Sequence, residues 1–316
     1  MSHKNLQGNW HVLVHGLRLE STPIILVPGL SLRSLDSVLS VFDLAAVGAK
    51  GFREWALIEP FAEECHCEII SSQDAATVPG FDTLNRAWLV SNMLNLLGHS
   101  GHLPLACSRY SWNIIAGHQK RTSPQFRQQL VEESVERAVY APRGVLPRFM
   151  GQLLDYHVRV LVPKSTRKNG LTEEDAEWIR RHFDTTNRLA SECESFRYAL
   201  IAAKDWCFCE DTRAAIARLW SGIEAVFGIR SELAYRLSSL IASLLSPRGQ
   251  PRVVKFNSVK KLYSMRSKAV HGAPLSEETL AQAMDESFHL LKELILHLVG
   301  IGRPLTNEDF ETALFC

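Results

Sequence analysis

Apolar residues recur at helical spacing throughout the second half of the chain. Thr172 precedes three acidic residues and predicts a helix start, because a hydroxyl group and carboxylates satisfy the free N–H groups there. Asp211 and Gly228 bracket a second helix with one apolar stripe, and Ser276 begins the last helix. Short connections favour antiparallel neighbours, so we predict an all-α, up-and-down helical bundle over residues 171–316.

One helix of this bundle carries polar residues where apolar ones are expected. It is predicted to begin near Asn257 or Ser258 and to end at Gly272, with an apolar stripe of Val259, Leu262, Tyr263, Ala269 and Val270. Arg266 falls in the middle of this stripe and needs a partner or a polar cleft, since a lone buried charge is very costly. His271 follows five residues later, roughly 7.5 Å along the axis. At the helix end its ring could swing toward the face of Arg266.

The first half of the chain shows shorter and more mixed patterns. Trp10–Leu19 and Ile24–Leu30 are rich in β-branched residues and predict a β-hairpin. Further elements are expected as helices over Ser34–Ala46, Phe81–Leu97 and Pro124–Tyr140 and as a strand over Val158–Val162. The polar loop Lys164–Gly170 is the predicted boundary. The fold class is therefore α+β, with a mixed α/β domain over residues 1–170 before the bundle.

Composition is that of an ordinary soluble globular protein, with 46% hydrophobic residues, 22% charged residues and a net charge of +1. No secretory leader is recognisable, and the longest apolar stretches are too short or too interrupted to span a bilayer. We therefore expect a cytoplasmic protein with no membrane partner. The seven cysteines are expected to be reduced thiols.

Other chemistries find weaker support in the sequence. The pairs Cys65/Cys67 and Cys207/Cys209 have one residue between them, whereas structural zinc sites usually need two to four, so no metal or cofactor is expected. Ser100 lies in a Gly-His-Ser-Gly segment that lacks the G-x-S-x-G spacing of the serine hydrolase elbow. A hydrolase using Ser100 is kept as a third hypothesis.

Positive charge is concentrated in one part of the chain. No acidic residue occurs between Glu232 and Glu277, whereas the same stretch holds Arg236, Arg248, Arg252, Lys255, Lys260, Lys261, Arg266 and Lys268. Such a local patch is typical of a surface that binds a phosphate backbone, although a solvated basic face is the alternative. The candidate residues for binding a nucleic-acid phosphate backbone are Lys260, Lys261, Lys268 and Arg252.

Several segments resemble the Apea-like branch of the HEPN superfamily. Residues 262–272 (LYSMRSKAVHG) match a signature helix with a tyrosine, then Arg-Ser, a small-apolar pair and His-Gly, and Ser267 fits this branch. Residues 218–228 (RLWSGIEAVFG) are similar to the helix with an apolar-Glu-apolar motif, which singles out Glu224. The next helix, with Arg236, resembles its partner helix. The likeness covers about residues 205–300.

The resemblance implies a homodimeric, metal-independent ribonuclease. In this family two R-x-x-x-x-H helices face each other, so His271 would act on the RNA 2′-OH or the leaving 5′-oxygen while Arg266 holds the scissile phosphate. The residue types suit these roles, because histidine titrates near neutrality and a guanidinium matches phosphate oxygens. Glu224 is expected to pair with Arg266 or Arg236. Tyr263 is expected in the core, or in contact with substrate.

The family resemblance also implies a biological setting. Apea-like proteins are associated with bacterial defence and growth arrest, which makes residues 1–170 a candidate sensing or regulatory part. A regulatory partner or antidote is expected in such a system. The alternative is a HEPN bundle without catalysis, used for dimerisation or RNA binding.

Overall fold

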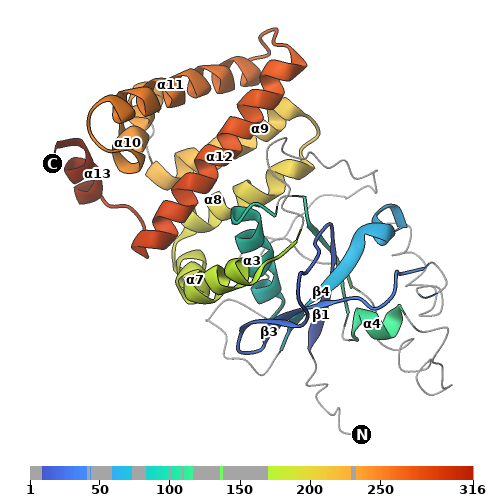
Figure 1. Cartoon of the computed structure of the whole chain (residues 1–316). Coiled ribbons are helices and arrows are strands. Elements are labelled where there is room, and N and C mark those ends of the chain that lie inside the picture. The colour runs from blue at the N-terminus through green and yellow to red at the C-terminus, as the bar shows by residue number, and fades with distance from the viewer. Residues whose placement is uncertain are drawn as a thin grey trace, which may run out of the picture. The chain divides into compact units, whose positions relative to one another are not determined.

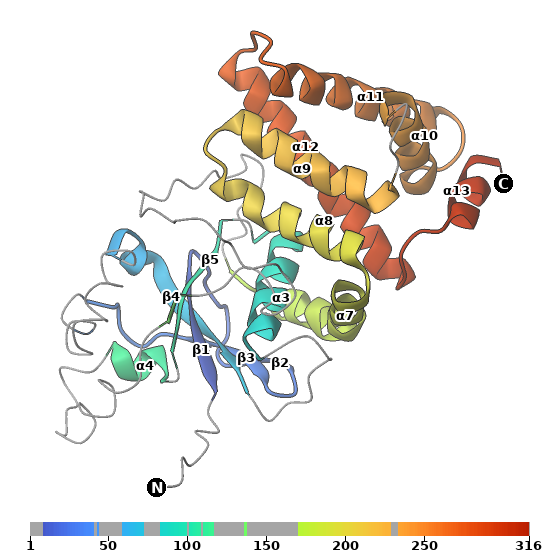
Figure 2. The ribbon, with the colours of Figure 1, turned by 180° about the vertical axis from the view of Figure 1, so that it is seen from behind.

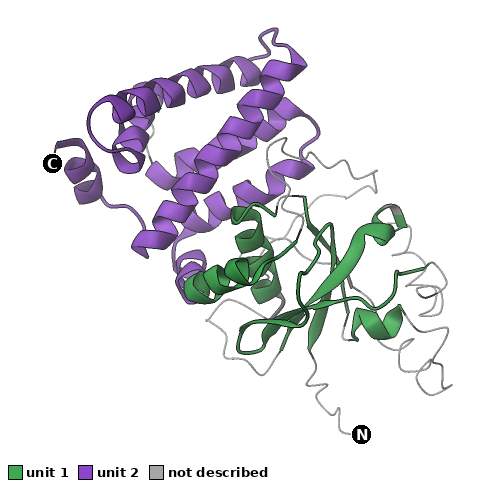
Figure 3. Ribbon diagram, viewed as in Figure 1, with its two compact units in different colours: residues 1–149, 167–183 green, residues 150–166, 184–316 purple. Residues whose placement is uncertain are grey.

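The computed structural model describes residues 9–40, 43, 59–72, 83–99, 101–108, 110–116, 136–137, 170–228 and 233–315. The chain forms two compact units, one of residues 1–149 with 167–183 and one of residues 150–166 with 184–316 (Figure 3). Helix α7 (Glu173–Glu192) contributes residues to both units. The first unit is built on an antiparallel sheet and the second is helical, which agrees with the α+β class. The predicted boundary loop lies almost entirely outside the described residues.

The first unit contains a six-stranded sheet in the order β2-β3-β4-β1-β5-β6, and its described pairings are antiparallel. Its strands are β1 (Trp10–His15), β2 (Ile24–Val27), β3 (Leu30–Ser34), β4 (Cys65–Ser71), β5 (Leu103–Ser108) and β6 (Glu136–Arg137). Strand β1 lies between β4 and β5, and its middle residues are buried. The centre of the sheet is therefore built from segments far apart in the sequence (Figure 2).

The predicted hairpin between the first two apolar segments is wrong. Strand β1 has β4 and β5 as partners, and β2 pairs with β3 instead. The physical reason is local, because the two-residue turn Pro28-Gly29, with Gly29 at a φ of 72°, lets the chain reverse within the segment Ile24–Ser34. Of the helix expected over residues 34–46, residues 34–40 are not helical because Ser34 ends β3, Asp43 is helical, and the other residues lie outside the described part of the chain.

The other predictions for this unit have mixed outcomes. The helix expected over residues 81–97 is confirmed as α3 (Thr83–Leu96), which packs on β1, β4 and β5. The helix expected over residues 124–140 is wrong at Glu136 and Arg137, which form the edge strand β6, and its other residues lie outside the described part of the chain. The strand expected over residues 158–162 also lies outside it.

Two short helices and the start of α7 complete the first unit. Helix η1 (Glu59–Glu64) and helix α4 (Trp112–Ile115) lie beside the sheet, and the Trp112 side chain is fully buried in a core that includes Leu13. Leu171 forms a parallel bridge with Leu19. The buried Asp175 accepts from His99 at 3.0 Å. The first turns of α7 are therefore part of this unit.

The second unit is a set of packed helices (Figures 1 and 2). After α7 these are α8 (Glu194–Asp205), η2 (Trp206–Phe208), α9 (Thr212–Phe227), α10 (Leu233–Leu245), α11 (Gln250–Val270), α12 (Glu277–Ile301) and α13 (Asn307–Phe315). Helix α9 packs against α8, α11 and α12, while α10 pairs with α11 and carries α13. Among the described helices, none combines the length and the apolar run that crossing a membrane requires.

Local signals placed most helix ends correctly. Asp211 caps α9 by accepting from the Ala214 N–H at 2.8 Å, and Gly228 ends it in a left-handed conformation. Ser276 caps α12 as predicted. The start of α11 is wrong by about two turns: it begins at Gln250, since Pro251 occupies the first turn, where its missing N–H is not needed.

A glycine lets three helices of this unit approach closely. A Cβ atom added at Gly222 of α9 would lie 2.7 Å from the Ala202 Cβ of α8 and 3.0 Å from the Leu291 Cδ2 of α12. Two residues earlier, the Trp220 Nε1–H donates to the Ser287 hydroxyl of α12 at 3.0 Å. Helix α9 is therefore fixed between α8 and α12. Glu224 lies on the same helix, one half-turn after Gly222.

Candidate functional site

Helices α9 and α11 bring the predicted Glu224 and Arg266 together. An Nη of Arg266 lies 3.1 Å from the Glu224 carboxylate, and each side chain is 23% exposed. Of the two arginines considered for Glu224, Arg266 is the one within ion-pair distance. The arginine on the apolar side of α11 thus has a carboxylate partner, which offsets the cost of its partial burial.

Arg266 retains unused hydrogen-bonding capacity. Its Nε and the facing carboxylate oxygen of Glu224 are buried and have no hydrogen-bond partner among the described residues. Since a buried polar group without a hydrogen-bond partner is costly, the contact with Glu224 satisfies Arg266 only in part.

Tyr263 forms one wall of this site. The Arg266 guanidinium lies 5.5 Å from the centre of the Tyr263 ring, and the Trp220 ring meets the same tyrosine edge-on at 5.2 Å. Burial raises the pKa of Tyr263, although the nearby Arg266 opposes this effect. Tyr263 is half-buried. Val270 was also predicted to lie in the core, but it is 46% exposed, so the prediction is wrong for this residue. The helix turns that residue away because it lies one position past the buried Ala269.

His271 lies at the end of α11, where its side chain is exposed. Its backbone N–H donates to the Ser267 carbonyl at 3.0 Å, and Gly272 follows with a φ of 72°. The Ala273 N–H then returns to the Lys268 carbonyl at 3.0 Å, which is a Schellman cap. The backbone around the imidazole is therefore fixed while the ring faces solvent.

Arg213, which the sequence analysis did not identify, fixes this turn from α9. Its Nη1 donates to the Ala269 carbonyl at 2.9 Å and its Nη2 donates to the Ala273 carbonyl at 2.8 Å. The two acceptors lie on either side of His271. Charge-assisted bonds are among the stronger hydrogen bonds, so Arg213 holds the His271 turn against the start of α9. Only a contact between distant segments reveals this role, and no local motif marks it.

The candidate RNA-binding residues fall into two groups. Lys260, Lys261 and Lys268 are exposed on α11, and Arg236 is exposed on α10. Arg252, in contrast, donates to the backbone carbonyls of Ser246, Ala313 and Ser243 at 3.3, 3.0 and 3.4 Å. Its guanidinium joins the ends of α10 and α13 and is engaged by these three carbonyls, unlike the exposed lysines. Ser267 is half-buried and contributes its carbonyl to the cap.

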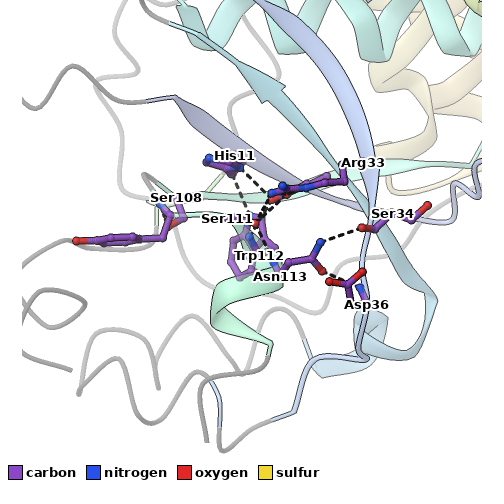
Figure 4. A network of polar contacts seen from close by, with 10 residues as sticks. His11, Arg33, Ser34, Asp36, Ser108, Ser111, Trp112 and Asn113 are labelled. Carbon is purple, nitrogen blue, oxygen red and sulfur yellow. Dashed lines mark hydrogen bonds and ion pairs between the residues drawn. The ribbon is translucent and has the colours of Figure 1, made fainter. Parts of the chain in front are cut away.

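A second polar cluster lies in the first unit (Figure 4). The Glu68 side chain is fully buried and accepts from His11 at 3.1 Å, from Arg33 Nε at 2.9 Å and from the Trp112 N–H at 2.8 Å. The Ser111 hydroxyl also donates to it at 3.0 Å. Burial raises the pKa of Glu68, but these donors outweigh burial and lower it overall. Both carboxylate oxygens of Glu68 accept hydrogen bonds. Because the donors come from different elements, the cluster joins β1, β3, β4 and the start of α4.

The residues considered for other chemistries have structural partners. His102 bonds Ser91 at 2.9 Å, His99 bonds Asp175, and Ser100 lies outside the described residues. Burial raises the pKa of Cys65 and of Cys207 to about 12, which disfavours the thiolate that a metal requires. In the described part of the chain, no three His, Cys, Asp or Glu side chains are grouped so as to hold a metal ion.

Comparisons with protein-family models, with curated proteins and with solved structures find no match for this chain.

Proposed function

We propose that this chain is a metal-independent endoribonuclease of the HEPN type, which acts as a homodimer and cleaves RNA by attack of the 2′-OH. One observation carries the proposal. Arg266 is held against Glu224 with an unsatisfied Nε, and His271 follows on the same helix, exposed, in a turn that Arg213 holds. A phosphate-binding cation and a proton-transfer group are thus presented by one helix end.

The chemistry needs few groups. The RNA 2′-oxygen attacks the adjacent phosphorus, the bond from phosphorus to the 5′-oxygen breaks, and the products are a 2′,3′-cyclic phosphate and a 5′-hydroxyl. One proton leaves the 2′-OH and one is added to the 5′-oxygen, and imidazole can perform either transfer. The Arg266 guanidinium would stabilise the charge that develops on the phosphate oxygens.

The homodimer supplies the second imidazole. The reaction needs one group that accepts a proton and a second group that donates one. A single chain has only one His271 to fill these two roles. Two copies with their α11 ends facing each other would provide both groups in a shared cleft. Sedimentation of the full chain is expected to give a dimer mass at micromolar concentration, and a monomer at that concentration would contradict the shared cleft.

The alternative is a HEPN module that binds RNA without cleaving it. The exposed Lys260, Lys261 and Lys268 support RNA binding under either proposal. A pure binding module would keep its RNA affinity after His271→Ala and would lose affinity, together with part of its salt dependence, after glutamine replaces these lysines.

Cleavage of a mixed RNA pool in EDTA tests the catalytic proposal. The wild-type chain is compared with His271→Ala and with His297→Ala, a partly exposed histidine of α12 that serves as a matched control. Wild type and the control are expected to release fragments that end in 2′,3′-cyclic phosphate, and His271→Ala is expected to release none. Equal cleavage by all three proteins would refute the proposed role of His271.

The proposed setting is bacterial defence or growth arrest in the cytoplasm. The first unit would then act as the sensing or regulatory part, with a partner or antidote that controls the nuclease. The support for this setting is the sequence resemblance of residues 205–300. Expression of wild type is expected to arrest growth of a bacterial host, and expression of His271→Ala is not.

A further inference from the structure

An aromatic pair lies exposed on the surface of the helical unit. Tyr235 on α10 is 64% exposed, and its ring meets the half-buried Phe256 ring of α11 at 5.5 Å and 74°. Helices α10 and α11 lie side by side in both views (Figures 1 and 2), so the two rings join neighbouring helices. A tyrosine left this exposed adds little to the core, and much of its surface is accessible to a partner.

The surroundings of this pair are cationic. The Lys260 Nζ lies 5.8 Å from the centre of the Phe256 ring, and Arg236 is exposed next to Tyr235 in the sequence. No acidic residue occurs from Leu233 to Ser276, so α10 and α11 carry none. Carboxylates from other helices contact α11 at Lys255, where Glu293 of α12 lies 2.5 Å away, and at Arg266, where Glu224 of α9 lies 3.1 Å away. A polyanion with flat, apolar faces is complementary to this surface.

We propose that Tyr235 and Phe256 form a stacking site for unpaired bases of single-stranded RNA, with Lys260 and Arg236 beside it to bind the phosphates. The inference rests on the proposed function in taking RNA as the ligand, but it does not require cleavage. Stacking of bases on exposed aromatic rings within a cationic surface is a common way to bind single strands with little sequence preference.

The same geometry disfavours a duplex as the ligand. In double-stranded RNA the base faces are already stacked on each other, and proteins contact mainly the phosphates and 2′-hydroxyls. Exposed rings then gain nothing from the bases, whereas lysines and arginines bind either form. The aromatic pair should therefore set the preference for single strands, while the cations set the overall affinity.

Fluorescence anisotropy with three labelled ligands of equal length separates these contributions. The ligands are a single-stranded RNA, a duplex RNA and an abasic single strand of equal charge per strand. The full-length proteins carry His271→Ala so that RNA stays intact. Tyr235→Leu is expected to weaken single-strand binding by about 5- to 150-fold. Its affinities for the duplex and for the abasic strand should stay within twofold.

Matched variants exclude a loss of structure as the cause. Tyr235→Phe keeps the ring and should retain single-strand affinity, and Tyr198→Leu, at a 41% exposed tyrosine of α8, should also retain it. Lys260→Gln should weaken all three ligands alike. These results would support the stacking site even if no RNA is ever cleaved.

Three outcomes would overturn the stacking site. The stacking site is refuted if Tyr235→Leu binds single-stranded RNA as tightly as the wild type does. It is also refuted if the substitution weakens binding of all three ligands by the same factor. Dissociation of a dimer by Tyr235→Leu would instead assign this surface to a second copy of the chain. If RNA is cleaved at His271 while Tyr235→Leu binds normally, the proposed function survives and the stacking site fails.

Discussion

The close approach at Gly222 permits a quantitative test of the helical unit. In Gly222→Ala the new methyl carbon would lie 2.7 Å from the Ala202 Cβ and 3.0 Å from the Leu291 Cδ2. Carbon atoms prefer separations of about 3.5–4.0 Å, so helix α8 would have to move by roughly 1 Å, because the alanine side chain cannot rotate away. Overpacking of this kind costs about 1–3 kcal/mol of the free energy of unfolding.

Gly300 of α12 is the matched control, because an added Cβ there meets nothing within 4 Å. Replacement of glycine by alanine inside a helix stabilises it by about 0.5–1 kcal/mol, and somewhat less near a helix end. Both variants share this gain, so the difference between them isolates the clash. Gly300→Ala should exceed the wild type in stability, and Gly222→Ala should lie about 1–3 kcal/mol below Gly300→Ala.

Urea and thermal unfolding of the full chain, followed by far-ultraviolet circular dichroism, measure this difference. One kcal/mol corresponds to about 2–8 °C in Tm for domains of this size range, so the separation is readily measured. Glu224 lies one half-turn beyond Gly222, so Gly222→Ala should also reduce the proposed RNA cleavage. Equal stabilisation by both substitutions would refute the tight crossing of α8, α9 and α12.

Three further predictions concern charged side chains that are partly or fully buried. Arg213→Lys cannot bind both carbonyls, so the proposed RNA cleavage should fall by about 10- to 100-fold in kcat with little change in KM; an unchanged kcat would refute its positioning role. Because its partners lower the pKa of Glu68, the stabilisation it provides is present above pH 4.5 and is lost as the pH falls through the folded-state pKa. Glu68→Gln should therefore show a flatter loss of urea midpoint in acid than the wild type, and parallel curves would contradict this. Burial lowers the pKa of Lys204 from 10.5 to about 8, so the charged form is disfavoured in the folded state. The stability of Lys204→Met relative to the wild type should therefore fall by roughly 3 kcal/mol as the pH rises from 7 to above 10.5, and a constant difference would exclude this titration.

The helical unit was predictable because its signals are local. Asp211, Gly228 and Ser276 mark helix ends through the chemistry of free N–H groups and left-handed backbone, which a few neighbouring residues determine. Arg266 stood out because a charge interrupted an apolar stripe, and that pattern correctly demanded a partner. The start of α11 was predicted at Asn257 or Ser258, whereas the helix begins at Gln250, where Pro251 is the local start signal.

What the sequence could not supply were contacts between distant segments. Strand β1 pairs with β4 and β5, whose residues lie 50 to 97 positions away, and no local pattern encodes that choice. The clamp from Arg213 to the His271 turn, and the pairing of Tyr235 with Phe256, likewise join residues of different helices. Periodicity identifies the faces of a helix but not the residue that each face meets.

The shared helix α7 has a consequence for how the protein is made. Leu19 pairs with Leu171, and His99 pairs with Asp175. The first unit is therefore complete only after residues 167–183, which follow the sheet in the sequence, have left the ribosome. The described strands of the sheet end at Arg137 and can pair before residues 167–183 are synthesised, whereas Leu19 and His99 gain their partners Leu171 and Asp175 only afterwards. The pairs that build the second unit, such as α8 with α9 and α10 with α11, are close in sequence and can form as soon as they emerge. An arrest of translation before residue 171 would thus release an incomplete first unit, with the helices that carry Arg266 and His271 not yet synthesised.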